Sequence, residues 1–285
     1  MDAKPSLEGL VARTTTVCSP PLIYQRLNEV INDPRSSVKD IGRVANEDQG
    51  LTARILKLAN SPMFGFYSRI DSIDRALTII GTQQVRDLAL AATVMRDFKD
   101  IDSRLINMHQ FWKHSVACGI VSRNLAVSLR QSNVERFFVH GILHDIGQLL
   151  MATAIPKTMS GILRMSREKK ELYFSTEAGQ LGFDHADLGG ALLSAWKIPQ
   201  NIVEPVTFHH RPRQSVKFPL ETAVVHLADL ICQAMEFGSS GEWCVPPLDS
   251  SAWDRLGLPV SSLGLLIHQT EPQFRATLSI LAEAA

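Results

Sequence analysis

The sequence has no excess of charge of either sign, because 29 Lys and Arg residues balance 29 Asp and Glu residues. Proteins that bind nucleic acids without sequence preference usually carry a basic excess, so we expect no general nucleic-acid binding. The balanced total does not exclude a local basic patch.

Cysteine is also scarce, and no two cysteines have the CxxC spacing of a zinc knuckle or a redox motif. The four are Cys18, Cys118, Cys232 and Cys244. We interpret them as isolated thiols of a reducing compartment rather than as a disulfide framework.

Long hydrophobic runs are missing as well. Residues 1–17 lack the apolar stretch of a signal peptide. The run Leu88–Met95 is far shorter than the roughly 18 residues that a membrane-spanning helix needs. We therefore expect a cytoplasmic protein without a membrane partner.

The alternation of apolar and polar residues that marks a half-buried strand is absent too, and helical patterns take its place. Apolar residues recur with helical spacing after Ser19-Pro20-Pro21, a combination that favours a helix start. Ser37 and Asp40 have the spacing of a capping box. Ser72 is placed to cap a further helix, and Gly81 stands where that helix would end. These patterns predict an all-α fold, and they indicate architecture rather than chemistry.

Histidine is concentrated in the second part of the chain, since all nine histidines lie between His109 and His268. Five of them stand where predicted helices start, end or turn, and two aspartates accompany them. These seven residues are His114, His144, His185, His209, His210, Asp145 and Asp229. Imidazole and carboxylate together suit Zn, Fe, Mn or Ni. Taken singly, however, each residue is more often a hydrogen-bonded core or surface side chain than a ligand.

The motif His144-Asp145-Ile146-Gly147 favours metal binding over the structural interpretation of single residues. It follows the apolar stretch Phe137–Leu143, so we expect the His-Asp pair within a buried helix or at its edge. A carboxylate in apolar surroundings is costly unless a metal ion or another cation neutralises it. A bound divalent ion is the simplest solution.

In this order the residues resemble the H…HD…D signature of the HD metal-dependent phosphohydrolase superfamily. The signature is matched by His114 in FWKHS, His144 and Asp145 in HDIG, and Asp229 in HLAD. His185 and the pair His209-His210 resemble the expanded set of binuclear members such as the HD-GYP phosphodiesterases.

A more specific resemblance is to the HDOD family, the HD-related output domains of bacterial signalling proteins. The segments DQGLTARILKLANSPMFG and IDSIDRALTIIGTQQVRDLALA resemble its N-terminal bundle, and GFDHADLGGALLSAWKIPQNIVEPVTFHH resembles its later part. The resemblance runs from about Val17 to about Ala234. It implies an all-α protein in which an N-terminal helical bundle packs on an HD-superfamily core. We expect the bundle in residues 1–100, the metal-site core in residues 101–240 and a C-terminal helical extension in residues 241–285.

The resemblance also implies a ligand set for two divalent transition-metal ions, with Fe, Mn, Zn and Ni all open. The first ion would be held by His114, His144, Asp145 and Asp229. The second would be held by His185, His209 and His210, with Asp145 as a bridge to the first. A carboxylate suits a bridge because it offers two oxygens, whereas each imidazole offers one free nitrogen.

Two departures from the HD-GYP enzymes bear on activity. Gln148 follows HDIG where those enzymes typically have lysine, and His209-His210 are followed by Arg211-Pro212-Arg213 instead of a Gly-Tyr-Pro element. Arg211 and Arg213 could hold a phosphate, since a guanidinium group suits that geometry. Exposed loop charges are the favoured interpretation of both, and no catalytic residue is assigned.

Two functional hypotheses follow. The favoured one is a non-catalytic regulatory or scaffolding output module of signalling, in which the two-metal centre is structural, vestigial or a ligand sensor. We expect a signalling protein partner and, as a possible ligand, a phosphate-like anion or a nucleotide. The alternative is an active metal-dependent phosphohydrolase, either a phosphodiesterase or a nucleotide phosphatase. Gln148 and the missing Gly-Tyr-Pro element favour the module, whereas the retention of seven candidate ligands favours the enzyme.

Overall fold

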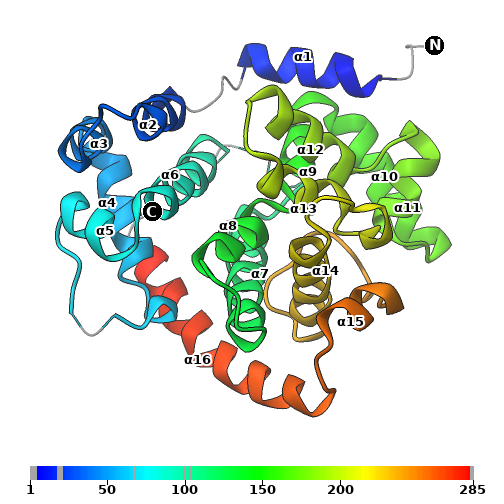
Figure 1. Ribbon diagram of the computed structural model, residues 1–285. Coiled ribbons are helices and arrows are strands. Elements are labelled where there is room, and N and C mark those ends of the chain that lie inside the picture. Colours follow the sequence, from blue (N-terminus) through cyan, green and yellow to red (C-terminus); the bar gives the residue numbers. More distant parts are fainter. Residues whose placement is uncertain (1–4, 18–21, 67, 99–100, 103, 283–285) are drawn as a thin grey trace. The chain divides into compact units, whose positions relative to one another are not determined.

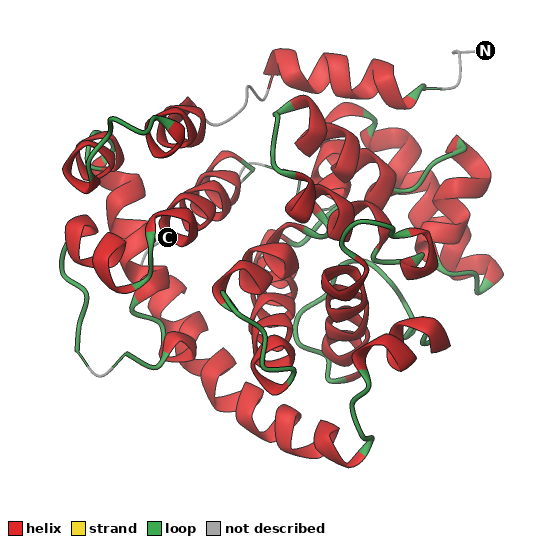
Figure 2. Ribbon diagram, viewed as in Figure 1, coloured by secondary structure: helices red, strands yellow, loops and turns green. Residues whose placement is uncertain are grey.

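The computed structural model describes residues 5–17, 22–66, 68–98, 101–102 and 104–282, and Figure 1 labels its helices along the chain. Within these ranges all regular secondary structure is helical, as Figure 2 shows, which confirms the predicted all-α fold. No single helix in these ranges is long and apolar enough to span a membrane. One pair bent by 120°, residues 135–154 with residues 156–169, passes the same test when taken together.

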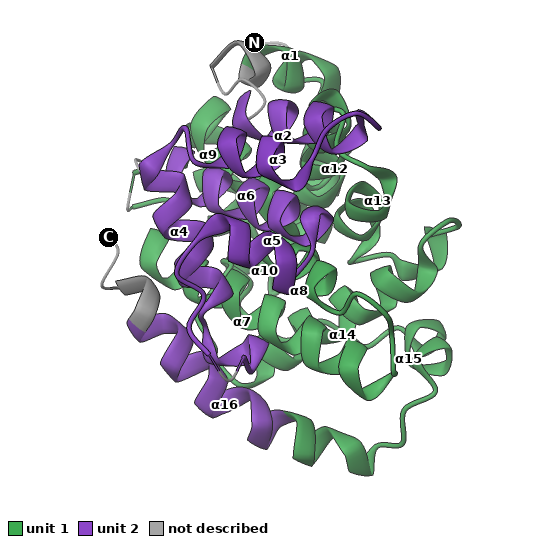
Figure 3. Ribbon diagram, turned by 60° about the vertical axis from the view of Figure 1, so that its left-hand side comes forward, with its two compact units in different colours: residues 1–19, 98–266 green, residues 20–97, 267–285 purple. Residues whose placement is uncertain are grey.

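The chain forms two compact units, each of which is discontinuous in sequence (Figure 3). The larger unit contains residues 1–19 and 98–266, and the smaller unit contains residues 20–97 and 267–285. The three consecutive segments expected from the sequence, with boundaries after residues 100 and 240, stay a prediction.

The smaller unit is built from helices whose ends follow local capping signals. They are α2 (Leu22–Asn32), α3 (Val38–Ala45), α4 (Gln49–Ala59), the 3₁₀ helix η1 (Pro62–Phe64), α5 (Ile73–Ile79), α6 (Thr82–Asp97) and the later part of α16 (Ser261–Ala282). Ser37 and Asp40 form the predicted capping box of α3, and Ser72 caps α5. Gly81 follows α5 with a φ of 103°, in the left-handed region that suits glycine. The helix start predicted at Ser19-Pro20-Pro21 lies outside the described residues.

The larger unit holds the remaining helices. They are α1 (Leu7–Val17), α7 (Met108–Ser128), α8 (Glu135–Leu143), α9 (Ile146–Ala154), α10 (Pro156–Lys169), α11 (Tyr173–Leu181), α12 (His185–Ala195), α13 (Gln200–Phe208), the 3₁₀ helix η2 (Pro212–Gln214), α14 (Pro219–Ala234), α15 (Ser250–Leu256) and the first residues of α16. Helix α7 packs on both α8 and α14, and α12 packs on both α9 and α13 (Figure 1). Helix α15 and the first residues of α16 lie in the segment 241–285, where we expect a C-terminal helical extension.

Two glycines allow close helix contacts in the larger unit. Gly141 on α8 packs against α7, where a β-carbon would lie 2.5 Å from the carbonyl carbon of Cys118. Gly147 on α9 packs against the start of α12, where a β-carbon would lie 1.9 Å from the carbonyl oxygen of His185. Both distances are far below van der Waals contact, so a larger residue would force the helices apart. The segment that carries the His-Asp pair is therefore held against the segment that begins with His185.

Candidate metal centre

The seven predicted ligands converge from several helices of the larger unit. His114 is on α7 and Asp229 on α14, His144 and Asp145 join α8 to α9, His185 begins α12, and His209 and His210 follow α13. Six of them are buried, and His210 is partly exposed. Buried polar side chains are costly unless they are paired or bind an ion, so this cluster requires a chemical explanation.

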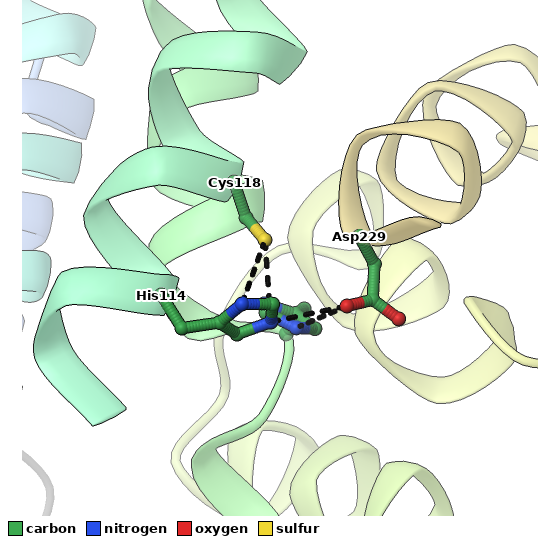
Figure 4. A group of neighbouring side chains, drawn as sticks. His114, Cys118 and Asp229 are labelled. Atoms are coloured by element: carbon green, nitrogen blue, oxygen red, sulfur yellow. Dashed lines mark hydrogen bonds and ion pairs between the residues drawn. The ribbon is translucent and has the colours of Figure 1, made fainter. Parts of the chain in front are cut away.

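One group of side chains surrounds His114. His114 Nε2 lies 3.0 Å from Asp229 Oδ1, and His144 Nε2 lies 3.8 Å from the same oxygen. Cys118 also belongs to this group, because its Sγ lies 3.4 Å from His114 Nε2 (Figure 4). One ligand atom from each of these four residues lies within 4.8 Å of the others, so the four could hold one metal ion.

A second group surrounds His185. Its Nε2 lies 3.1 Å from Asp145 Oδ1, and His209 Nε2 lies 3.8 Å from the same oxygen. His210 Nε2 lies 2.9 Å from His185 Nε2, so these two nitrogens need a proton or a cation between them. One ligand atom from each of these four residues again lies within 4.8 Å of the others.

Asp145 lies between the two groups. Its Oδ1 faces the second group, whereas its Oδ2 lies 3.2 Å from His144 Nε2 and 3.9 Å from His114 Nε2 in the first group. Burial raises the pKa of this carboxyl, but the nearby His144 and His185 outweigh burial and bring the pKa well below its usual value. The side chain is therefore a carboxylate with one oxygen directed to each group.

Three of the histidines are oriented by hydrogen bonds from their outer nitrogens. His144 Nδ1 donates to the Gly141 carbonyl at 2.7 Å, His209 Nδ1 donates to the Val206 carbonyl at 2.7 Å, and His185 Nδ1 donates to Glu177 Oε2 at 2.6 Å. A neutral imidazole that donates from Nδ1 leaves the lone pair of Nε2 free. Metal-binding histidines are usually held in this way by a carbonyl or a carboxylate. The inward-facing nitrogens can thus bind a cation once any proton on Nε2 has been released.

Some atoms that face the interior of the cluster have no hydrogen-bond partner among the described residues. They are His144 Nε2, His209 Nε2 and Asp145 Oδ2. His144 Nε2 and Asp145 Oδ2 lie 3.2 Å apart as an ion pair, but none of the three atoms makes a well-aligned hydrogen bond, and buried polar atoms without one are costly. A divalent cation would satisfy all three, and mixed imidazole and carboxylate donors are a set that transition metals prefer. The residues present fit such an ion.

The buried histidines do not share one protonation state. Burial lowers the pKa of His144, but the charges of Asp145 and Asp229 outweigh burial and raise the pKa to about 9. Burial and the neighbouring His144 lower the pKa of His209 to about 3. A proton on His144 therefore balances part of the carboxylate charge, and a metal ion would have to displace that proton.

A cavity of about 330 Å³ borders the cluster. His210 and Asp229, one residue from each group, line it together with Arg213 and Asp249. The Phe174 ring stacks on the His210 ring with a centroid distance of 4.2 Å. The cavity gives a small ligand a place beside both groups.

The two arginines considered as phosphate ligands pair with carboxylates. Arg211 Nη1 lies 2.9 Å from Asp184 Oδ2, and its Nη2 lies 2.6 Å from Asp187 Oδ1. Arg213 Nε lies 3.0 Å from Asp249 Oδ2, and most of the Arg213 side chain is exposed. Both guanidinium groups therefore have anionic partners, and phosphate binding by them stays a prediction.

Two residues at the cluster are not predicted from the sequence. Cys118 looks like an isolated thiol, yet it follows His114 by four positions on α7, a spacing that places both on one helix face. That spacing is a usable signal. Glu177 on α11 accepts hydrogen bonds from the ring of His185 and, at 2.9 Å, from its backbone amide. No motif surrounds Glu177, so only the folded arrangement identifies it.

The sequence matches a family model of the HDOD domain over residues 17–212. A structure of an HDOD domain protein of unknown function from Geobacter sulfurreducens has 23% sequence identity and a TM-score of 0.76, with 98% of each chain covered. A structure from Shewanella amazonensis, described provisionally as a phosphohydrolase, has 23% identity and a TM-score of 0.73, with 95% of this chain and 98% of that chain covered. At such identities the likeness establishes a shared fold and leaves function to the site.

A curated relative, an uncharacterized protein from Treponema pallidum, is 23% identical over 266 residues. These residues make up 92% of this chain and 48% of the relative. The chain therefore spans about half the length of the curated relative that it matches.

Proposed function

Since this chain belongs to the HDOD family, we propose that it is a regulatory output module of bacterial signalling built around a two-metal centre. The module would take its input from a signalling protein partner and bind a phosphate-like or nucleotide anion. The observation that carries the proposal is the position of Asp145, whose two oxygens are directed to two different donor groups. The HDOD resemblance supports the signalling role, and the donor set supports the metal.

In the proposed centre, each ion takes the donors that surround it. The first ion is held by His114, His144 and Asp229, the second by His185, His209 and His210, and Asp145 bridges the two. When bound, two divalent ions bring up to four positive charges, of which the carboxylates of Asp145 and Asp229 offset two. The remaining positive charge favours an anion in the cavity beside His210.

The surroundings of the centre support binding rather than catalysis. Gln148, which replaces the lysine of the related phosphodiesterases, is buried and uncharged. Arg213 is the one Lys or Arg among the described residues that line the cavity, and Asp249 neutralises it. A catalyst must stabilise the transition state more than the bound substrate, and loss of one electrostatic contact commonly costs about 10²–10³ in rate.

The second candidate function is a metal-dependent phosphohydrolase, and the cavity is the observation that favours it. A ligand in this cavity would touch His210 and Asp229, which belong to different donor groups. The Shewanella amazonensis structure, provisionally described as a phosphohydrolase, shares the fold. If Arg213 left Asp249, its guanidinium could hold a substrate phosphate.

Metal analysis and an activity assay separate the two functions. Protein purified without chelator should contain two transition-metal ions per chain and should bind inorganic phosphate in a calorimetric titration. Protein loaded with Mn, Fe or Zn in turn should then show little or no turnover of a generic phosphodiester or of cyclic dinucleotides.

The outcomes are distinct. Robust turnover that disappears in Asp145→Ala would reject the non-catalytic module and establish the phosphohydrolase. The two-metal centre itself would be rejected if protein purified without chelator contained no metal and also failed to take up Mn, Fe or Zn.

A further inference from the structure

Cys118 is a donor beside the first group that the HD-type ligand set does not include. It lies on α7 four residues after His114, and residues at this spacing share one helix face. Both side chains therefore project toward the same point, to which α14 brings Asp229 (Figure 4). Cys118 is completely buried, so its thiol faces the cluster rather than solvent.

The distances allow Cys118 to share an ion with its neighbours. Its Sγ lies 3.4 Å from His114 Nε2, and His114 Nε2 in turn lies 3.0 Å from Asp229 Oδ1. The ligand atoms of His114, Cys118, His144 and Asp229 all lie within 4.8 Å of one another. Two nitrogens, one oxygen and one sulfur thus surround one point, beside the Asp145 oxygen that faces this group.

We propose that Cys118 binds the first ion as a thiolate, together with His114, His144, Asp229 and the bridging Asp145. The inference rests on the proposed two-metal centre and assigns a ligand to it. Metal sites filled by protein ligands are typically structural, whereas sites that act on a ligand keep an open position. The first ion then stabilises the fold, and the second ion, next to the partly exposed His210, meets the anion.

A thiolate ligand changes the chemistry of the first site. On binding, the thiol releases its proton to solvent and the sulfur forms a bond to the metal. Thiolate is a soft ligand that favours Zn or Fe over Mn, so the first site becomes selective. The thiolate also adds a third negative charge to those of Asp145 and Asp229, which leaves one net positive charge for an anion.

Cys232 provides a matched control. It is as deeply buried as Cys118 and follows Asp229 by three positions on α14. It is not among the residues whose ligand atoms converge on a common point. Its thiol forms a hydrogen bond with that of Cys118, so Cys232 shares the environment of Cys118 without being a proposed ligand.

The test uses Co²⁺ as a spectroscopic probe of the whole 285-residue chain. Chelator-treated protein refilled with Co²⁺ should show the near-ultraviolet charge-transfer absorption of a thiolate bound to cobalt. Cys232→Ser should retain this absorption, whereas Cys118→Ser should lose it and should bind Co²⁺ at least about 10-fold more weakly, since even outer partners of ligands contribute 10–100-fold. Circular dichroism of both variants checks the fold.

A measurement on the unmodified protein keeps the test valid if Cys118→Ser does not fold. X-ray absorption of the zinc-loaded protein should contain a sulfur neighbour at about 2.3 Å from zinc. A zinc shell of nitrogen and oxygen alone, or a charge-transfer band that persists in Cys118→Ser, would overturn the assignment of Cys118 while leaving the two-metal centre intact. A protein that takes up no metal at all would instead reject the proposed centre on which the assignment rests.

Discussion

At the scale of single residues, the orientation of three inward-facing imidazoles depends on a partner outside the cluster. Backbone carbonyls hold His144 and His209, and no side-chain substitution can remove them. His185 is different because its partner is the carboxylate of Glu177, which accepts hydrogen bonds from the ring and from the backbone amide. Glu177 is therefore the orienting partner that mutation can address.

We predict that Glu177→Gln weakens metal binding about 10- to 100-fold, the usual effect of removing such an outer partner. The amide oxygen still reaches His185, but it lacks the charge that makes a carboxylate a strong acceptor. Competition with a metal chelator measures the affinity. Glu168→Gln is the control, because Glu168 is exposed and pairs only weakly with Arg164. An affinity of Glu177→Gln equal to that of this control would contradict the proposed role.

At the scale of elements, the contact between α9 and α12 brings the two donor groups together. Asp145 directly precedes α9, and His185 is the first residue of α12. Gly147 lies at the point of closest approach, with no room for a β-carbon beside the His185 carbonyl. The glycine of the HDIG motif thus determines the separation of a first-group segment from a second-group ligand.

We predict that Gly147→Ala lowers the free energy of unfolding by about 1–3 kcal/mol, the usual cost of overpacking, and weakens metal binding because His185 is displaced. Urea denaturation of chelator-treated protein measures the first effect, and a metal titration measures the second. Gly161→Ala on α10 is the matched control, since nothing lies within 4 Å of its added β-carbon. There the better helix propensity of alanine should add up to about 1 kcal/mol. Equal free energies of unfolding for the two variants would show that α12 moves away from the added methyl group without loss of stability.

The predictable parts of the fold are those determined by neighbours in sequence. The capping box of Ser37 and Asp40 and the helix end at Gly81 can be predicted from the sequence, because a helix cap depends only on residues nearby in the chain. The position of the His-Asp pair at a helix edge can be predicted for the same reason. The role of Glu177 cannot, because its hydrogen bond with His185 depends on how α11 packs against α12. The pairing of Arg211 with two aspartates on and beside α12 likewise joins residues more than twenty positions apart.

At the scale of the whole molecule, the metal-free protein should lose stability as the pH rises from 6.5 to 9. The pKa of His144 is raised to about 9 because its carboxylate neighbours outweigh burial, so the folded state holds a proton that the unfolded state has released. The pKa of His185 is raised in the same way beside Glu177. Burial lowers the pKa of His209 to about 3, so its opposing contribution is small and ends as the unfolded chain loses this proton just above pH 6.5. Burial raises the pKa of Glu242 to about 7, which acts in the same direction up to that pH.

Metal-loaded protein should lose this dependence on pH in the same window. Protons compete with the metal for His144, so apparent metal affinity rises with pH. This gain in binding offsets the loss of metal-free stability, because neither the metal-loaded folded state nor the unfolded state holds the His144 proton. Urea denaturation at pH 6.5 and pH 9, with chelator and with saturating Zn²⁺, measures both slopes, and His144→Gln should flatten the chelator slope. A metal-free protein that gains stability toward pH 9 would contradict the protonated state of His144. Parallel slopes with chelator and with Zn²⁺ would show that this histidine does not exchange its proton for a metal ion.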